Sequence, residues 1–365
     1  MKIPNWLERA LADPSLTDLC LNGVSSAYAD RGEGLRLVEG SDSGAWTEDE
    51  LKQWVLSLLS SAGKTWDAKM PFVDAALPSG FRLHAAFPPM SSQGLLASLR
   101  RLARPDPDCS GSGLERRWSS SPGLQLLREA VLAGDSILIS GSTGSGKTTL
   151  ASDLLGLVPP HERILALEDT PELRPAHPHF VNLVSRPPNA DGFGEVTLRS
   201  LLKQALRMRP DRIVLGECRG AEVLELLQCL NTGHRGSLAT LHANSPRDAL
   251  RRVELLCLLA AQGSIPLGAI RELLALGIHW LVQVERVGSE RRITEISRIE
   301  GREGDTILLR PMVQPLAHGI PKGAAANLVS QARRAAGEER VLPALLGAGQ
   351  PERLSAAGGS LGRPL

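Results

Sequence analysis

Apolar and polar residues alternate with two different periods over the first hundred residues. Short strand-like runs occupy residues 18–21, 27–30, 81–86 and 96–99. An amphipathic helix follows the sequence TEDE, in which Thr47 and Glu50 have the spacing of a capping box. Apolar residues then recur at helical spacing, at Leu51, Trp54, Val55, Leu58 and Leu59. The pattern predicts a small α+β domain over residues 1–103.

The next segment has no hydrophobic period. Residues 104–122, RPDPDCSGSGLERRWSSSP, are rich in Pro, Ser and Gly. Such a composition is typical of a connection between domains. We therefore predict an interdomain linker here.

A different pattern runs from residue 123 to 312, where short apolar runs alternate with helical patterns. The predicted strands are 136–140, 164–167, 213–215 and 238–241, and the predicted helices are 148–157, 196–208, 221–231 and 246–260. Ser245 is the expected N-cap of the last helix, with Pro246 in its first turn. Alternating strands and helices predict an α/β domain, a mostly parallel sheet with helices on both faces.

The remaining residues, 313–365, are dominated by Ala, Gly and Pro. We predict a largely disordered tail with one helix near residues 328–336, because this composition buries little apolar surface. Nothing in this segment indicates chemistry.

Composition narrows the possible partners. The chain has 365 residues with 41 basic and 40 acidic side chains and only 3% aromatic residues, which disfavours a nucleic-acid partner. Its five cysteines contain no CxxC pair and are expected to be reduced thiols. We expect neither a secretion signal nor a membrane span, so membrane association would need a partner protein.

The sequence GSTGSGKTT fits the Walker A pattern GxxxxGK(S/T) between a predicted strand and a predicted helix. Lys147 would bind the β- and γ-phosphates of ATP, and the Thr148 hydroxyl would bind Mg²⁺. The alternative is an ordinary glycine-rich turn. The candidate nucleotide-binding residues of the motif are Gly141, Ser142, Thr143, Gly144, Ser145, Gly146, Lys147, Thr148 and Thr149.

Two further strands end in carboxylates. The run DRIVLGE ends at Glu217, which would polarise the attacking water or order Mg²⁺ at the carboxyl edge of the sheet. The run RILALED ends at Glu168 and Asp169, where Asp169 is a second candidate magnesium ligand. Surface carboxylates at strand ends, or a solvated loop, are the alternatives.

Two histidines flank another predicted strand in GHRGSLATLHAN. His234 and His242, if neutral, could sense the γ-phosphate. The alternative is that both are satisfied by local hydrogen bonds.

In their order and spacing, these motifs resemble the secretion (traffic) ATPase superfamily of type II and type IV systems. The resemblance extends to RPPN at residues 186–189, to the runs 194–220 and 231–250, and to TDLCLNG, GFRLHAAFPP and SLRRL in the first domain. It is closest to the branch of tight-adherence (Flp-type) pilus assembly and conjugal-transfer ATPases. The tetracysteine zinc motif of many type II members is absent, which favours this branch.

The resemblance implies a RecA-like P-loop ATPase domain preceded by a nucleotide-covering domain. It further implies a homohexameric ring at the cytoplasmic face of the inner membrane, where a membrane platform protein would be its partner and ATP hydrolysis would drive pilus assembly or protein secretion. It assigns Glu217 as the Walker B catalytic carboxylate, Glu168 as its assistant, and His234 and His242 as coupling residues.

Several arginines also have roles implied by the resemblance. Arg82 and Arg100 match arginines of the covering domain that approach the phosphates, and an arginine acting across a subunit interface would be one of Arg199, Arg207, Arg209 and Arg219. Two alternatives remain open: a nucleotide-gated structural adaptor that scarcely hydrolyses ATP, and a nucleic-acid motor with the same core.

Overall fold

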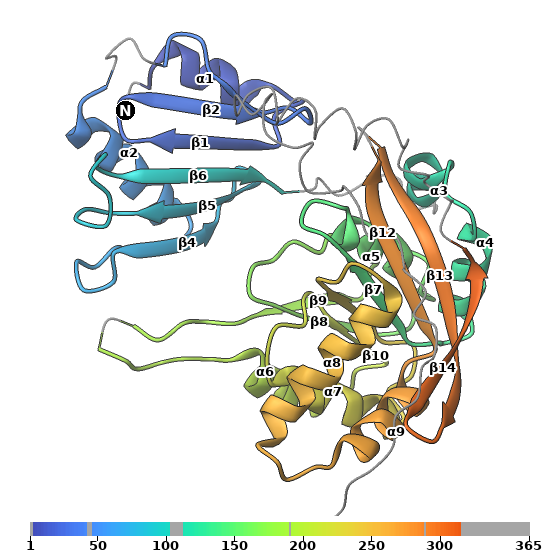
Figure 1. The fold of residues 1–365 in the computed structure, drawn as a ribbon. Coiled ribbons are helices and arrows are strands. Elements are labelled where there is room, and N and C mark those ends of the chain that lie inside the picture. The colour runs from blue at the N-terminus through green and yellow to red at the C-terminus, as the bar shows by residue number, and fades with distance from the viewer. Residues whose placement is uncertain (1–2, 42–45, 103–111, 190, 288–289, 315–365) are drawn as a thin grey trace, which may run out of the picture. The chain divides into compact units, whose positions relative to one another are not determined.

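The structure is a computed structural model, and it describes residues 3–41, 46–102, 112–189, 191–287 and 290–314 (Figure 1). The predicted helix near 328–336 therefore lies outside the described residues. No helix in these ranges combines the length and the apolar character that a bilayer crossing requires.

The first domain is an antiparallel sheet with helices packed on one face. Its strands lie in the order β3-β2-β1-β6-β5-β4. They are β1 (Asp18–Asn22), β2 (Ser26–Asp30), β3 (Leu35–Leu37), β4 (Phe72–Ala76), β5 (Phe81–Ala86) and β6 (Leu96–Arg101), with helices α1 (Asn5–Ala12) and α2 (Glu48–Ser61). Along β1, Leu19 and Leu21 are buried against the helices and alternate with more exposed residues. The capping box of Thr47 and Glu50 is present at the start of α2, as predicted.

The second domain contains an eight-stranded sheet in the order β14-β13-β12-β7-β11-β10-β8-β9. Its strands are β7 (Ile137–Gly141), β8 (Ile164–Glu168), β9 (Phe180–Val184), β10 (Arg212–Leu215), β11 (Leu238–Leu241), β12 (Trp280–Val287), β13 (Glu290–Glu303) and β14 (Thr306–Val313). The strands from β12 to β9 pair in parallel, and β13 and β14 add an antiparallel edge.

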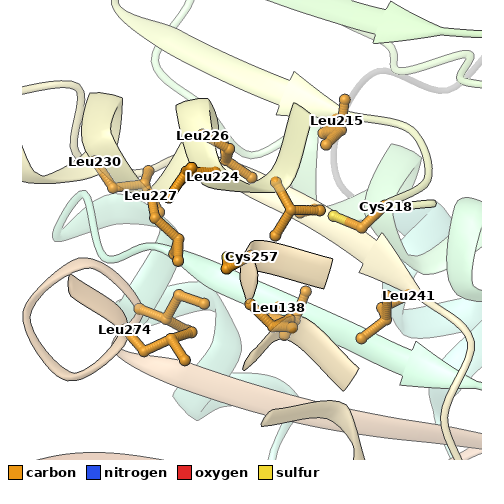
Figure 2. Packing of buried hydrophobic residues seen from close by; sticks show 14 of the residues in the cluster. Leu138, Leu215, Cys218, Leu224, Leu226, Leu227, Leu230, Leu241, Cys257 and Leu274 are labelled. Atoms are coloured by element: carbon orange, nitrogen blue, oxygen red, sulfur yellow. The ribbon is translucent and has the colours of Figure 1, made fainter. Parts of the chain in front are cut away.

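Helices cover both faces of this sheet, which confirms the predicted α/β class. They are α3 (Ser112–Trp118), α4 (Leu124–Leu132), α5 (Lys147–Leu155), α6 (Leu198–Ala205), α7 (Glu222–Asn231), α8 (Pro246–Ala261) and α9 (Leu267–Gly277). One core packs α3, α4 and α5 against the sheet, and the other packs α6 to α9. Figure 2 shows the second core, where leucines of α7 meet Cys257 of α8 and Leu138 of β7.

The segment predicted as a linker is partly a helix of the second domain. Helix α3 lies within residues 104–122, and Leu114 and Trp118 are each only 1% exposed in the core beside α5. The indole Nε1 of Trp118 donates a hydrogen bond to Asp153 on α5 at 2.9 Å. A single i, i+4 apolar pair is too short to give a period among so many Ser and Gly residues, which is why the pattern did not reveal it.

Replacing Trp118 with Ala tests whether α3 belongs to this core. The change removes a fully buried ring and leaves Asp153 without its indole donor, so we expect the free energy of unfolding to fall by about 3–5 kcal/mol. Denaturant unfolding measures this. The control is Leu132→Ala on α4, where the side chain is 56% exposed and the expected change is within about 0.5 kcal/mol. Equal effects of the two changes would show that α3 is not part of the core.

Candidate functional site

The strand order places the predicted motifs along one edge of the parallel sheet. Strands β7, β11, β10 and β8 are consecutive neighbours, and their carboxyl ends point the same way. Following these ends in spatial order, the chain supplies the Walker A loop, His242, Glu217 and Glu168. Ligands of open parallel sheets bind outside the carboxyl ends of the strands. The predicted residues therefore lie at the edge where this kind of sheet binds its ligands.

The Walker A loop turns sharply between β7 and α5. Gly144 and Gly146 have φ values of 75° and 102°, which a residue with a Cβ rarely adopts. Helix α5 begins at Lys147, and the first N–H groups of a helix lack intrahelical partners. Ser145 is buried, and its hydroxyl oxygen has no hydrogen-bond partner among the described residues. The loop thus provides backbone donors and the positive end of a helix, which together suit a phosphate group.

The ammonium group of Lys147 is hydrogen-bonded to the Walker A loop itself. Its Nζ donates to the carbonyl oxygens of Gly141 at 3.0 Å and Ser142 at 2.8 Å, and it lies 3.3 Å from Nδ1 of His242. These three contacts use all three ammonium protons. Burial lowers the pKa of Lys147 to about 8, although the nearby carboxylates of Glu217 and Glu172 partly oppose that effect.

His242 connects the Walker A lysine to the carboxylate of Glu217. An ammonium cannot accept a hydrogen bond, so Nδ1 of His242 accepts from Lys147 and Nε2–H donates to Glu217 Oε1 at 3.0 Å. Burial lowers the pKa of His242, and the positive charge of Lys147 lowers it further. The imidazole is therefore neutral at pH 7, in the tautomer that this chain of contacts requires.

Glu217 is fixed by its neighbours on both sides. The N–H of Gly216 donates to Leu167 of β8 at 2.9 Å, and the N–H of Cys218 donates to Thr240 of β11 at 2.8 Å. Burial alone would raise the pKa of Glu217, but the hydrogen bond and charge of Arg219, followed by the charges of His242 and Lys147, lower it. The carboxylate is thus ionised at neutral pH, with only 24% of its side chain exposed.

Arg219 contacts the carboxylate oxygen of Glu217 that His242 does not contact. Its Nη2 donates to Glu217 Oε2, and its Nη1 lies 3.9 Å from Asp169. The carboxylate of Glu222 accepts from the N–H groups of Arg219 at 2.8 Å and Gly220 at 2.7 Å, which holds this turn at the start of α7. The contacts therefore run without a break from Lys147 through His242, Glu217 and Arg219 toward Asp169.

Glu168 has a different environment from Glu217. Its Oε1 accepts from the N–H groups of Glu172 and Leu173, each at 3.0 Å, and its Oε2 accepts from the side chain of Asn182. Burial raises the pKa of Glu168 to about 7, although these hydrogen bonds partly oppose it. A Cβ at Gly216 would lie 2.6 Å from Cγ of Glu168, so Glu168 packs directly against the strand end that leads to Glu217. These contacts give Glu168 a positioning role, and a catalytic role stays a prediction.

The residues expected to bind Mg²⁺ provide oxygen atoms of the kind that this ion prefers. Thr148 is the second residue of α5, and Asp169 follows β8, with 40% of its side chain exposed. Asp169 accepts from the Ser185 hydroxyl at 2.6 Å. Within the described ranges there is no group of three or more acidic, His or Cys residues positioned to hold an ion. The donor set fits an ion that takes its other ligands from nucleotide and water.

The remaining predicted residues are not part of this line of contacts. His234 is in the loop before β11, at the end of that strand opposite to His242, and its buried Nδ1 has no hydrogen-bond partner within the described ranges. Its coupling role stays a prediction. Arg82 and Arg100 are directly opposite each other on β5 and β6 of the first domain, where they pair with Asp74 at 3.3 Å and Asp18 at 2.8 Å respectively. Their approach to phosphate also stays a prediction.

Of the four arginines weighed for a role across a subunit interface, the structure brings only Arg219 to this edge. Arg199 pairs with Glu225 of α7, and Arg207 and Arg209 are exposed beyond the end of α6.

Two supporting residues were not foreseen from the sequence. Gln283 is buried on β12, accepts from Ser140 at 2.5 Å and donates to the carbonyl of Ala243 at 3.3 Å, so it fixes the turn that carries His242. A lone glutamine in the apolar run WLVQV was the available signal. Glu172, on the loop held by Glu168, lies near enough to Lys147 to raise its pKa.

The Glu168→Gln variant tests the energetic role of this carboxyl group. Because the folded pKa of about 7 lies above the ordinary glutamate pKa of 4.5, the stabilising contribution of the protonated form is lost as pH rises from 4.5 to 7. The variant should be more stable than the unaltered protein at pH 8, by about 1–3 kcal/mol, with little difference near pH 4.5. Thermal unfolding at both pH values measures this.

Glu195→Gln is the matched control for Glu168→Gln, because it makes the same change at an exposed glutamate. It should leave the pH dependence unaltered. If Glu168→Gln and the unaltered protein show parallel stability from pH 4.5 to 8, Glu168 is not the buried, high-pKa group described.

Comparison with known proteins agrees with this geometry. The family model for type II/IV secretion system proteins matches residues 5–276. The type IV secretion system protein PtlH of Bordetella pertussis is 34% identical over 323 residues, covering 80% of this chain and 91% of that protein. The conjugal transfer protein TrbB of Rhizobium radiobacter is 33% identical over 299 residues, covering 80% and 86%.

Higher identity is found with the protein Rv3659c of Mycobacterium tuberculosis, at 41% over 308 residues, covering 82% of this chain and 85% of that protein. Among solved structures, the pilus retraction motor PilT with bound ADP matches with a TM-score of 0.57 at 17% identity, covering 91% of this chain and 90% of that one, which supports the fold alone. The resemblance seen in the motifs is confirmed, and the chain belongs to the type II/IV secretion system protein family.

Proposed function

We propose that this protein hydrolyses ATP to ADP and phosphate and uses the reaction to power a secretion or conjugation machine. The observation that carries the proposal is the hydrogen-bonded connection of Lys147, His242 and Glu217 beside the Walker A loop. It places a phosphate-binding cation and an ionised carboxylate on the same sheet edge, and a neutral imidazole joins them.

Binding of the triphosphate would begin at the loop. The N-terminal N–H groups of α5 and the ammonium of Lys147 complement its negative charge. For Lys147 to reach the phosphates, its bonds to the carbonyls of Gly141 and Ser142 must be exchanged for bonds to phosphate oxygens. Lys147 would then move away from His242, so phosphate binding would remove the hydrogen bond that Nδ1 of the imidazole accepts.

Thr148 and Asp169 would hold Mg²⁺ together with the nucleotide. The ion supplies positive charge that neutralises the phosphate oxygens when it is bound. The chain's own contribution is to orient these oxygen ligands, through the first turn of α5 for Thr148 and through the Ser185 hydroxyl for Asp169.

Hydrolysis needs a base for the attacking water, and Glu217 fits this role. The water oxygen forms a bond to the γ-phosphorus, the bond from that phosphorus to the bridging oxygen breaks, and ADP leaves with the electron pair. The water proton passes to the carboxylate of Glu217. His242 remains neutral and orients the carboxylate, whereas departure of Arg219 from Glu217 would raise its basicity by removing a positive charge.

The wider machine is proposed from the relatives. PtlH is named as a type IV secretion system protein and TrbB as a conjugal transfer protein. We propose that this chain works as a homohexamer at the cytoplasmic face of an inner membrane, against a platform protein of such a machine. The near balance of 41 basic and 40 acidic side chains favours a protein partner over a nucleic acid. Membership of the tight-adherence branch stays a prediction.

Two substitutions test the proposed reaction. Lys147→Ala should abolish Mg²⁺-dependent release of phosphate from ATP because the phosphates lose their main cation. Glu217→Gln should lower turnover by about 10²- to 10⁴-fold and keep ADP affinity, since only the base is lost. Phosphate release and ADP titration measure the two effects. Glu195→Gln, an exposed carboxylate, is the control and should match the unaltered protein.

The outcomes of this experiment also separate the alternatives. Unaltered turnover in Glu217→Gln would refute the assigned base. Nucleotide binding without measurable hydrolysis by the purified protein would favour the nucleotide-gated adaptor. Strong stimulation by single-stranded DNA, with a steep salt dependence, would favour the nucleic-acid motor.

The lowered pKa of Lys147 predicts a pH-dependent nucleotide affinity. The free protein loses this proton near pH 8, whereas bound phosphates favour the charged ammonium, so binding above pH 8 takes up a proton. ADP affinity should therefore fall as pH rises above 8, by up to about tenfold per pH unit. Calorimetric titrations in buffers of different ionisation enthalpy measure the proton uptake. Lys147→Arg keeps its charge in this range and should show no such uptake; uptake by both proteins, or by neither, would contradict the assignment.

A further inference from the structure

A second positive group lies beside the Walker A loop, on β13 rather than on any predicted motif. The side chain of Arg291 crosses the loop: a Cβ placed on Gly146 would lie 2.7 Å from its Cδ and 3.5 Å from its Cγ. Its Nη1 donates to the hydroxyl of Thr149, in the first turn of α5, at 3.3 Å. The guanidinium thus stands at the positive end of the helix that follows the loop.

Arg291 is a cation without an acidic partner in the part of the chain that the structure describes. Among the described residues, its side chain bonds only to the neutral Thr149 hydroxyl and forms no ion pair. The neighbouring arginine, Arg292, pairs instead with Glu290 at 2.7 Å. Burial lowers the pKa of Arg291, and the positive charges of Arg286 and Arg117 lower it further. An uncompensated guanidinium next to other cations and a helix N-terminus suits an anion.

The strand order decides which part of a nucleotide would come there. Strand β7, which leads into the loop, has β11 on one side and β12 on the other. His242 and Glu217 follow β11 and β10, so the γ-phosphate is directed to that side. Val284 of β12 is opposite Gly141, and Arg291 is opposite Arg286 two residues further along β12. A nucleotide whose γ-phosphate faces Glu217 must extend its α-phosphate and ribose toward β12 and β13.

We propose that Arg291 is a nucleotide-binding residue that donates hydrogen bonds to the α-phosphate of the nucleotide held by the Walker A loop, an inference that rests on the proposed function. Thr149, in the first turn of α5, accepts a hydrogen bond from this guanidinium through its hydroxyl. The planar guanidinium can donate two parallel hydrogen bonds to two phosphate oxygens. In this arrangement Arg291 binds the α-phosphate, and Lys147 binds the β- and γ-phosphates.

The test compares two anions on the intact chain by calorimetric titration. ADP presents both an α- and a β-phosphate, whereas inorganic phosphate fills only the centre of the loop. Arg291→Ala should weaken ADP binding by about tenfold or more, as for the loss of a charge-assisted hydrogen bond. It should change inorganic phosphate binding by no more than about twofold. Arg291→Lys, which keeps the charge, should recover part of the ADP affinity.

Arg292→Ala is the matched control, because it removes the same charge from the next residue, whose partner is Glu290. It should bind both anions like the unaltered protein, and thermal unfolding should show all variants folded. Unaltered ADP affinity in Arg291→Ala would overturn the inference, and so would an equal loss of ADP and phosphate binding. If the unaltered protein binds neither anion, the proposed ATPase function fails first, which distinguishes the two failures.

Discussion

The site depends on one constraint, the alignment of four adjacent parallel strands whose carboxyl ends meet at a single edge. Because β7, β11, β10 and β8 are neighbours in that order, the residues that follow them form a continuous line of polar contacts. Each strand is buried on both faces, so the polar groups at its end are partly shielded from water. That shielding lowers the pKa values of Lys147 and His242 and raises that of Glu168.

The same line of contacts restrains the side chains of Lys147 and Glu217. The ammonium of Lys147 donates its hydrogen bonds to two carbonyl oxygens and an imidazole nitrogen. The carboxylate of Glu217 forms an ion pair with Arg219. A phosphate that recruits Lys147 must break contacts that reach, through His242, the carboxylate that would activate water. Binding and activation therefore share the same hydrogen bonds.

The sequence was sufficient to predict the parts of the site but not their assembly. Lys147 was identified from the Walker A pattern, and Glu217 and His242 because each follows an apolar run; a motif and a strand end are both local properties of the sequence. Which strands are neighbours is not local: β7 and β11 pair across about a hundred residues. The contact between Lys147 and His242 could therefore not be foreseen. Helix α3 and the strands β12 to β14 were missed because their apolar pairs are short or their alternation is weak.

The same strand order places different side chains on the two sides of the Walker A loop. His242 and Glu217, which are proposed to act at the γ-phosphate, follow β11 and β10 on one side of the Walker A loop, whereas Arg291 lies on the antiparallel hairpin on the other side. Trp118 and the stem of Arg291 both pack on Gly146, so the loop is supported from the side opposite to the chemistry. A Cβ at position 146 would contact Arg291 rather than His242 or Glu217. The glycine is thus required by the close approach of β13 as well as by its positive φ.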